Sequence, residues 1–326
     1  MQDIVFNIES ELNHILKKNK KDKKDKKDKK DKKDNNIDIS NNQINNIKIL
    51  ILSGGGTRGM TYYGVFKALD ELNILKNIHT FATTSVGSFF AGMYLIGYNT
   101  DELVDFMYLF DMKKLSGLDS FENIQFLDIL QNFGLDDGEN IHIIFNKLLK
   151  AKGLKENMTL LELYNITKKK FIATSVCINT KEAIYISHEN YPELRISDSI
   201  RMSSCFPFYY KPVIYKNKYY VDGGLINNYP INLFKDNIDE VVGVLMDNKY
   251  EYAEINTFQS FFYNCLLTFM KGLSYNTFKG WEKNTIYIEI KQMNILQFDM
   301  SKEFKNNMYN IGYNAVLDYF KNREKN

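Results

Sequence analysis

The sequence predicts an α/β fold with a mainly parallel central sheet flanked by helices. Residues 47–53 (IKILILS) form a short apolar run rich in β-branched residues, and a segment with helical periodicity follows at 60–72. Residues 79–85 (HTFATTS) and 86–97 (VGSFFAGMYLIG) repeat this order. Two strand–loop–helix units in tandem are typical of a parallel sheet, because parallel strands need a crossover connection between them.

The rest of the chain supplies further elements of both kinds. Residues 100–165 look mostly helical, and a short helix over 197–204 is expected to end near Pro207. Further strands are expected at 170–178, 183–187, 218–224, 240–246 and 285–290. Long helices are expected at 252–276 and 302–322.

The chain divides into three predicted parts. Residues 1–46 combine a short N-terminal helix with a charged low-complexity linker, whose Lys–Asp repeat at 17–34 is expected to be solvated and partly disordered. Residues 47–235 form the predicted catalytic domain, and residues 236–326 form a C-terminal α/β region packed on the same core. Docking of the Lys–Asp repeat on anionic lipid is the less favoured interpretation, because its aspartates cancel part of the attraction.

Composition and charge exclude several classes of protein. The 326 residues carry a net charge of +2, which gives no electrostatic preference for nucleic acid. Three widely spaced cysteines show neither metal-ligand spacing nor a disulfide framework, so we expect no metal and a reducing setting. No secretory signal begins the sequence, and residues 258–273 are too short and too polar to span a bilayer. We therefore expect an intracellular protein that is soluble or peripherally associated with a membrane.

A glycine-rich loop follows the first strand and opens directly onto a helix; it comprises Gly54, Gly55, Gly56, Thr57, Arg58 and Gly59. Its backbone N–H groups and the helix N-terminus predict a cradle for an anion, either a phosphate or the oxyanion of a tetrahedral intermediate. A dinucleotide site would need an acidic residue about 20 positions later, but residues 74–84 contain neither Asp nor Glu. A Walker-type loop is excluded because no Gly-Lys-Ser/Thr ends the run. A glycine turn used for packing alone is the remaining alternative.

Ser85 stands between a predicted strand and a predicted helix, where a nucleophile elbow holds its serine. Gly87 lets the helix approach the neighbouring chain. Thr83 replaces the glycine that such elbows usually carry, so we expect strain or a small shift at this position. Alternatively, Ser85 only caps the helix. The rest of the site has to decide between these interpretations.

Asp222 is the predicted partner of Ser85. The histidines are His14, His79, His142 and His188, and none follows position 188, whereas a triad in the usual hydrolase order needs a late histidine. His188 is therefore interpreted as an ordinary loop residue. Asp222 ends an apolar strand, and the turn of Gly223 and Gly224 would let its carboxylate face a cleft, although such turns are also common without function. Burial there would raise the pKa of the carboxyl group.

Together these motifs resemble those of the patatin-like phospholipase family. The resemblance covers residues 47–235 and extends to the segments IRMSSCFPFYYKPV and GGLINNYPI on either side of the Asp222 strand. It implies a three-layer patatin-like fold and a Ser–Asp dyad, in which Ser85 attacks an ester carbonyl and Asp222 accepts its proton. Backbone N–H groups around Gly55 and Gly56 would stabilise the oxyanion, and the arginine of the loop would orient it or attract an anionic head group.

The resemblance also implies a phospholipid or other acyl lipid as substrate, reached by transient contact with a membrane surface. No cofactor or metal is required, nucleic acid is not a partner, and no oligomeric state is predicted. Two positions depart from the family pattern: Thr83, and Ser175, where many relatives carry an aspartate and a structural role is expected. Thr83 motivates the alternative of a catalytically silent protein that binds lipid or a protein partner.

Two segments could present apolar surface near the cleft. One is the aromatic-rich segment 258–270, and the other lies within residues 86–112. Large apolar side chains are more often buried than exposed, so core helices are the favoured interpretation of both segments.

Overall fold

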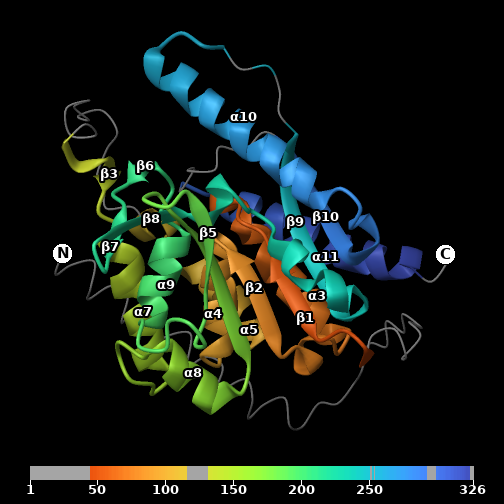
Figure 1. Ribbon diagram of the computed structural model, residues 1–326. Coiled ribbons are helices and arrows are strands. Elements are labelled where there is room, and N and C mark those ends of the chain that lie inside the picture. Colours follow the sequence, from red (N-terminus) through yellow and green to blue (C-terminus); the bar gives the residue numbers. More distant parts are fainter. Residues whose placement is uncertain (1–44, 116–130, 250–251, 253, 292–298, 324–326) are drawn as a thin grey trace.

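A computed structural model describes residues 45–115, 131–249, 252, 254–291 and 299–323. The helix and the Lys–Asp repeat predicted within residues 1–44 lie outside these ranges. The centre of the molecule is a mainly parallel sheet with helices packed against it, which confirms the predicted α/β fold (Figure 1).

Five parallel strands form the main part of the sheet, in the order β10–β9–β1–β2–β4. They are β1 (Ile49–Leu52), β2 (Thr80–Thr84), β4 (Lys170–Cys177), β9 (Val241–Lys249) and β10 (Thr285–Lys291). In β1, Leu50 and Leu52 belong to the larger of two hydrophobic cores, whereas Ile49 and Ile51 belong to the smaller. Successive side chains of a strand point to opposite faces, so a strand covered on both faces is apolar throughout.

Three antiparallel strands complete the sheet: β5 (Glu182–Ile186), β8 (Lys218–Asp222) and β7 (Val213–Tyr215), which pairs with β8. On β4, residues 170–174 pair with β2, 173–177 with β5 and 175–177 with β8. Because a strand has only two edges, β8 uses the same edge of β4 as β2 does. The ends of β2 and β8 therefore meet beside β4.

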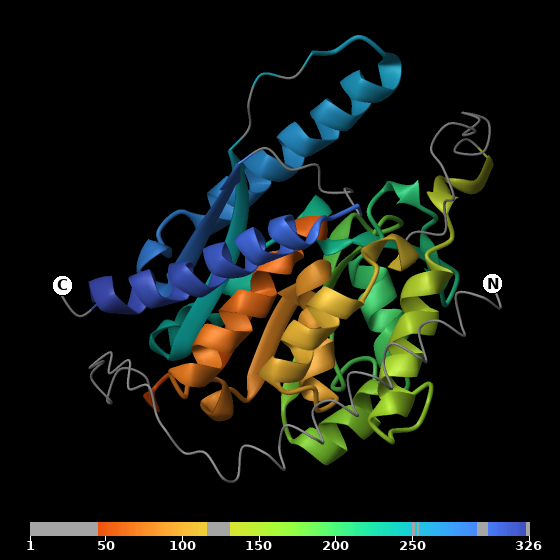
Figure 2. The ribbon, with the colours of Figure 1, turned by 180° about the vertical axis from the view of Figure 1, so that it is seen from behind.

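Helices cover both faces of the sheet. The face turned toward the viewer in Figure 2 carries α3 (Thr61–Glu71), α4 (Val86–Leu95), α5 (Thr100–Leu109) and α11 (Lys302–Arg323). The larger core lies under these helices and extends to α7 (Glu139–Ala151), α8 (Leu160–Thr167) and α9 (Ile196–Ser203). The smaller core lies on the opposite face, under the 3₁₀ segment η6 (Pro230–Glu240) and the C-terminal end of α10 (Phe258–Phe278). Shorter 3₁₀ segments are η2 (Gly56–Met60), η3 (Leu75–Asn77), η4 (Met112–Leu115), η5 (Gly223–Leu225) and η7 (Glu282–Asn284).

The structure differs from the sequence prediction at several element boundaries. The segment 100–165 contains a strand, β3 (Gly134–Asp136), which pairs with β6 (Phe208–Tyr210) in a separate two-stranded sheet. β3, β6 and β7 are each only three residues long, which is too short to show an alternating pattern of apolar and polar residues. The strand predicted at 218–224 ends at Asp222, because the two glycines enter the η5 turn. The helix predicted at 252–276 begins at Phe258, where Thr257 and Ser260 form a capping box.

α10 is the element that departs most from expectation. The favoured interpretation of residues 258–270 as a core helix is wrong, because several of their phenylalanines are exposed. The N-terminal end of α10 projects beyond the rest of the molecule in both views (Figures 1 and 2). In contrast, α4, within the second segment considered for apolar surface, is buried along most of its length. No helix in the described ranges is long and apolar enough to cross a membrane.

Candidate active site

Ser85 occupies the sharp turn between β2 and α4. Its backbone angles are φ 53° and ψ −125°, a sparsely populated region for a residue with a side chain. Such a conformation costs about 1–3 kcal/mol and persists only where neighbours hold it. The Ser85 N–H donates to the Ser203 hydroxyl at 2.9 Å, and a Cβ at Gly87 would lie 2.6 Å from the Leu52 carbonyl oxygen. These contacts fix the elbow against β1 and α9.

Asp222 is the last residue of β8 and is almost completely buried, with 3% of its surface exposed. Its N–H donates to the Cys205 carbonyl at 2.8 Å, and its carboxylate accepts the Gly224 N–H at 2.7 Å. A Cβ at Gly223 would lie 2.4 Å from the Thr174 carbonyl oxygen. Only glycine therefore lets the chain turn this closely over β4 directly after Asp222.

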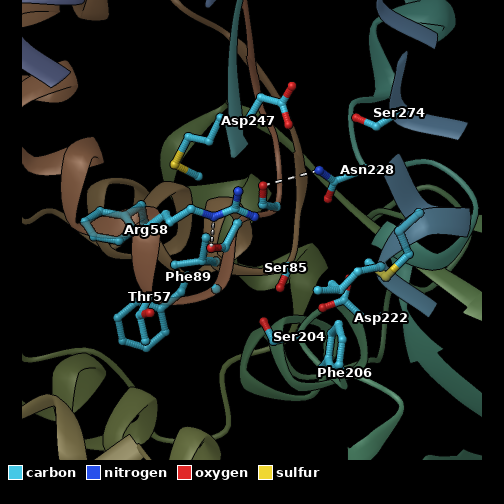
Figure 3. A pocket seen from close by; sticks show the side chains of 18 of the residues that line it. Thr57, Arg58, Ser85, Phe89, Ser204, Phe206, Asp222, Asn228, Asp247 and Ser274 are labelled. Atoms are coloured by element: carbon cyan, nitrogen blue, oxygen red, sulfur yellow. Dashed lines mark hydrogen bonds between the residues drawn. The ribbon is translucent and has the colours of Figure 1, made fainter. Parts of the chain in front are cut away.

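β4 brings the two residues together. Thr84, just before Ser85, pairs with Thr174 in β4, and Asp222 pairs with the next residue, Ser175, along the same edge. In Figure 3 the Ser85 hydroxyl and the Asp222 carboxylate lie close together in the pocket. The two residues are far apart in sequence, but the end-to-end meeting of β2 and β8 makes them neighbours.

The electrostatics of Asp222 suit a base. Burial raises the pKa of Asp222 from 3.8 to about 6, while hydrogen bonding from Ser85 and the Gly224 N–H partly offsets this rise. A carboxylate with this pKa is still mostly ionised at neutral pH and is a stronger base than an exposed aspartate. No histidine of the described residues lines the pocket, and His188 instead stacks on Tyr164 with ring centres 3.7 Å apart.

The glycine-rich loop lies beside Ser85 and is held by Asn228. The Gly54 N–H donates to the Asn228 carbonyl at 3.2 Å, and the Asn228 amide donates back to the Gly54 carbonyl at 3.3 Å (Figure 3). Gly54 therefore anchors the loop, since its N–H is already bonded. Within the described ranges the N–H groups of Gly55 and Gly56 have no hydrogen-bond partner, which leaves them available to an anion.

The second half of the glycine-rich loop contacts both the first half of the loop and the turn that holds Ser85. The Arg58 Nε donates to the Gly55 carbonyl at 3.0 Å, which supports the expected role of Arg58 in orienting the loop. Thr57 is buried within η2, and a Cβ at Gly59 would lie 2.3 Å from the Val86 side chain. The loop thus packs directly on the first turn of α4.

A cluster of buried hydroxyl groups (Thr83, Ser88 and Ser203) lies behind Ser85. The Thr83 hydroxyl donates to the Ile172 carbonyl at 2.8 Å and lies 2.9 Å from the Ser88 hydroxyl. Ser88 lies 2.9 Å from Ser203, whose hydroxyl donates to the Thr174 carbonyl at 2.7 Å. The threonine that replaces the usual glycine is therefore fully hydrogen-bonded inside the protein and keeps ordinary strand angles. The unusual backbone angles lie at Ser85 instead.

Ser175 has the structural role that its position suggested. It is buried, and its hydroxyl donates to the Val221 carbonyl at 2.8 Å and the Met202 carbonyl at 3.2 Å. These bonds join β4 to β8 and α9. Sequence reasoning missed Ser88, Ser203 and Asn228 as site residues, because their importance comes from partners distant in the chain.

The pocket above Ser85 has a cavity volume of about 140 Å³ and is mainly apolar. Its apolar lining comes from α3, α4, α7 and α10 and includes Tyr63, Phe89, Phe90, Ile141, Leu267 and Met270. Ser85, Asp222 and the glycine-rich loop lie together in this pocket (Figure 3), and Asp247, Lys271 and Ser274 add further polar groups to its lining. This arrangement suits an ester whose carbonyl lies beside Ser85 while a hydrocarbon chain contacts the apolar part of the lining. Within the described ranges no three His, Cys, Asp or Glu side chains gather as metal ligands.

Comparisons with known proteins agree with this geometry. A family model described as patatin-like phospholipase matches residues 50–235, more than half of the chain. Protein R571 of Acanthamoeba polyphaga mimivirus is 28% identical over 289 residues, which cover 85% of this chain and 94% of that protein. The probable lipid hydrolase 463L of Invertebrate iridescent virus 6 is 30% identical over 187 residues, covering 57% of this chain and 62% of that protein. VipD from Legionella pneumophila has a similar fold, with a TM-score of 0.59 and 17% identity over 85% of this chain and 67% of VipD.

Proposed function

Because this chain belongs to the patatin-like phospholipase family, we propose that it hydrolyses carboxylic ester bonds of phospholipids or related acyl lipids through a Ser85–Asp222 dyad. One observation carries the proposal: the strained elbow of Ser85 and the buried carboxylate of Asp222 meet beside β4, next to free N–H groups of a glycine loop. Nucleophile, base and oxyanion donors are the three parts that acyl transfer needs.

In the first half of the reaction, the Ser85 Oγ attacks the ester carbonyl and passes its proton to the Asp222 carboxylate. The carbonyl oxygen becomes an oxyanion, which the N–H groups of Gly55 and Gly56 stabilise. The tetrahedral intermediate then collapses, and the alcohol part of the lipid leaves with the proton held by Asp222. The acyl group remains as an ester on Ser85.

In the second half, water replaces the alcohol. Asp222 removes a proton from the water, whose oxygen attacks the acyl-enzyme carbonyl, and the same N–H groups stabilise the second oxyanion. Collapse of this intermediate returns the proton to the Ser85 oxygen and releases the fatty acid. Every proton is thus carried by Asp222.

The class of substrate follows from the pocket and from the relatives. The pocket lining is mostly aliphatic and aromatic, which suits a hydrocarbon chain better than a strongly polar acyl group. A relative that is 30% identical over its matched part is described as a probable lipid hydrolase. Both observations favour a long-chain acyl ester.

The alternative, a catalytically silent protein that binds lipid or a partner, was motivated by Thr83. The Thr83 side chain bonds to Ile172 and Ser88 and does not line the pocket. It therefore gives no physical reason for a blocked site, and hydrolysis is the better supported function.

The test combines turnover with labelling of the serine. Wild-type protein should release fatty acid from phosphatidylcholine vesicles and react with a fluorophosphonate. Ser85→Ala should abolish both, and Asp222→Asn should lower turnover about a thousandfold or more while leaving the fold intact. The matched control is Ser197→Ala, which removes a buried α9 hydroxyl that has no partner among the described residues.

Labelling that persists in Ser85→Ala would overturn Ser85 as the nucleophile. A wild-type protein that neither releases fatty acid nor reacts with the probe would overturn hydrolysis and favour the silent alternative.

A further inference from the structure

α10 presents an apolar face to each side. Its inward face, including Tyr263, Leu267 and Met270, packs on the larger core. Its outward face carries large apolar side chains that are exposed to solvent: Phe258, Phe261, Phe262, Phe269 and Leu273. Phe258 and Phe269 are the most exposed of these, at 64% and 72%. A helix of a globular protein normally has one apolar stripe, so the second one requires an explanation.

The outward face is a continuous stripe, because its members follow helical spacing. Positions 258, 262, 269 and 273 are separated by four, seven and four residues, which brings them onto one side of a helix. The stripe extends onto the body of the protein, where Phe208 contacts Phe262 edge to face at 4.8 Å. The exposed apolar surface therefore forms a patch larger than a few scattered side chains.

The charges of α10 suit a lipid surface. Between Phe258 and Lys279 the only charged residues are two lysines, Lys271 and Lys279, and no acidic residue occurs. Such a helix avoids repulsion by anionic or zwitterionic phospholipid and would meet no complementary charge on a basic partner. A helix that presents phenylalanine and leucine on one face can bind at the boundary between head groups and acyl chains without crossing the membrane.

α10 also borders the proposed route of the substrate, through the side of the helix that is turned toward the protein. Leu267, Met270, Lys271 and Ser274 of α10 line the pocket that contains Ser85 (Figure 3 shows Ser274). A cavity of about 140 Å³ is below the roughly 300–1,000 Å³ of sites that enclose a drug-sized ligand. A phospholipid with two long chains must then stay partly in its bilayer while its ester reaches Ser85. The pocket therefore has to open next to a membrane.

We propose that the outward face of α10 is the surface on which this protein docks to a phospholipid membrane. Docking there inserts the phenylalanine side chains among the lipids and holds α10, whose other side lines the pocket, at the bilayer surface. This inference rests on the proposed lipid hydrolase function, since it assigns how that site meets its substrate. Because apolar contact dominates, binding depends only weakly on salt.

The first test measures binding without turnover. Ser85→Ala protein is sedimented with vesicles of phosphatidylcholine and phosphatidylglycerol, alone and with Phe258→Gln and Phe269→Gln combined. Losing two exposed phenylalanines should weaken binding at least about tenfold. The matched control is Ile166→Gln, since Ile166 is 57% exposed on α8, at the other end of the molecule (Figure 1).

The second test separates docking from chemistry. In protein that keeps Ser85, the two phenylalanine substitutions should lower release from vesicles but leave hydrolysis of a soluble short-chain nitrophenyl ester unchanged. A wild-type protein that binds vesicles but cleaves neither substrate would remove the proposed function while leaving the docking surface supported. Equal loss on vesicles and on the soluble ester would overturn docking, because the phenylalanines would then act on the pocket itself.

Other results would also overturn the inference. The Ser85→Ala protein failing to bind vesicles would be one such result. Vesicle binding that is unchanged by the two phenylalanine substitutions would be another. A wild-type dimer that becomes monomeric on substitution, with vesicle binding unchanged, would identify the face as a protein interface instead. With the native Trp281 replaced by phenylalanine, Phe269→Trp should become quenched by brominated phospholipid, whereas Ile166→Trp should not.

Discussion

Two parts of the molecule contribute to the same pocket: the residues beside β4, which include Ser85 and Asp222, and the helix α10. They differ in how far their side chains are buried. Around β4, the hydroxyl cluster, Asp222 and Ser85 are buried and hydrogen-bonded to neighbouring elements, with the Ser85 N–H donating to the Ser203 hydroxyl and the Asp222 carboxylate accepting the Gly224 N–H. On α10, by contrast, Phe258, Phe261 and Phe269 are more than half exposed. Positions that need accurate geometry are thus held by buried polar contacts, whereas the positions proposed to meet a bilayer are held by one helix alone.

This contrast predicts where substitutions act. Changes beside β4 should alter both stability and the chemical step, because the same contacts support the fold and the dyad. Changes on the outer surface of α10 should leave both nearly intact and alter only contact with lipid. The predictions below test this division, beginning with the largest effect.

Among substitutions that leave Ser85 and Asp222 in place, Gly223→Ala should have the largest effect. Its methyl group would lie 2.4 Å from the Thr174 carbonyl oxygen, which belongs to the backbone of β4 and cannot move without disturbing the sheet. We expect a loss of about 1–3 kcal/mol of unfolding free energy. Displacement of Asp222 should lower kcat about a hundredfold. Denaturant unfolding and turnover of a soluble ester measure the two effects.

Gly272→Ala is the matched control on α10. A Cβ at this exposed position meets no atom within 4 Å, and alanine favours a helix over glycine by about 1 kcal/mol. We expect slightly higher stability and unchanged turnover of the soluble ester. Equal sensitivity of Gly223 and Gly272 would remove the distinction between the two regions.

The pH dependence should follow Asp222. Since the base acts when ionised, kcat/KM for the soluble ester should rise about tenfold per pH unit at low pH and level off above the pKa of about 6. The residual activity of Asp222→Asn should no longer show this rise. A profile that levels off near pH 4 would show that Asp222 behaves as an exposed carboxyl group.

The same pKa shift affects stability in the opposite direction. The folded-state pKa of about 6 lies above the ordinary 3.8, so burial of the protonated form is favoured and stability is lost as pH rises through this range. Complete ionisation should lower the unfolding free energy on the order of 3 kcal/mol. The stability of Asp222→Asn relative to wild type should therefore increase between pH 4 and pH 8.

Ser203→Ala should have an intermediate effect. It removes the acceptor of the Ser85 N–H and the donor to the Thr174 carbonyl, leaving buried groups unpaired. We expect a loss of about 1–3 kcal/mol of stability. The elbow would also be less firmly held, so kcat should fall about tenfold with little change in KM. Ser197→Ala on the same helix should change neither quantity, because its hydroxyl has no partner among the described residues.

Thr83→Gly should have the smallest effect on activity. The Thr83 hydroxyl bonds to Ile172 and Ser88 and stays outside the pocket, so restoring the usual glycine should not raise turnover. It should lower stability by about 1–2 kcal/mol, since two buried contacts and side-chain packing disappear. A large gain in turnover would mean that the threonine blocks the site.

Local pattern was enough to predict the elements that carry the site. The apolar runs before Gly54 and Ser85, and the glycines after Asp222, each depend on a few consecutive residues, and the structure has the corresponding strands and turns at these positions. Three-residue strands such as β6 were missed, because their pairing with β3 leaves no periodic pattern in the sequence. Asn228 was missed for a related reason: its contacts to Gly54 join segments far apart in the chain.

The sequence alone thus determined the strand–loop–helix units, the three motifs and their order, because backbone preferences and side-chain periodicity are local. Only the tertiary structure decided which edge of β4 receives β8, and hence that Asp222 meets Ser85. It also decided that Thr83 belongs to a hydroxyl cluster and that one side of α10 stays exposed. The physical reason is common to all three. The type of a side chain shows whether burial or hydrogen bonding would stabilise it, but the packing of distant elements decides whether it is buried or bonded.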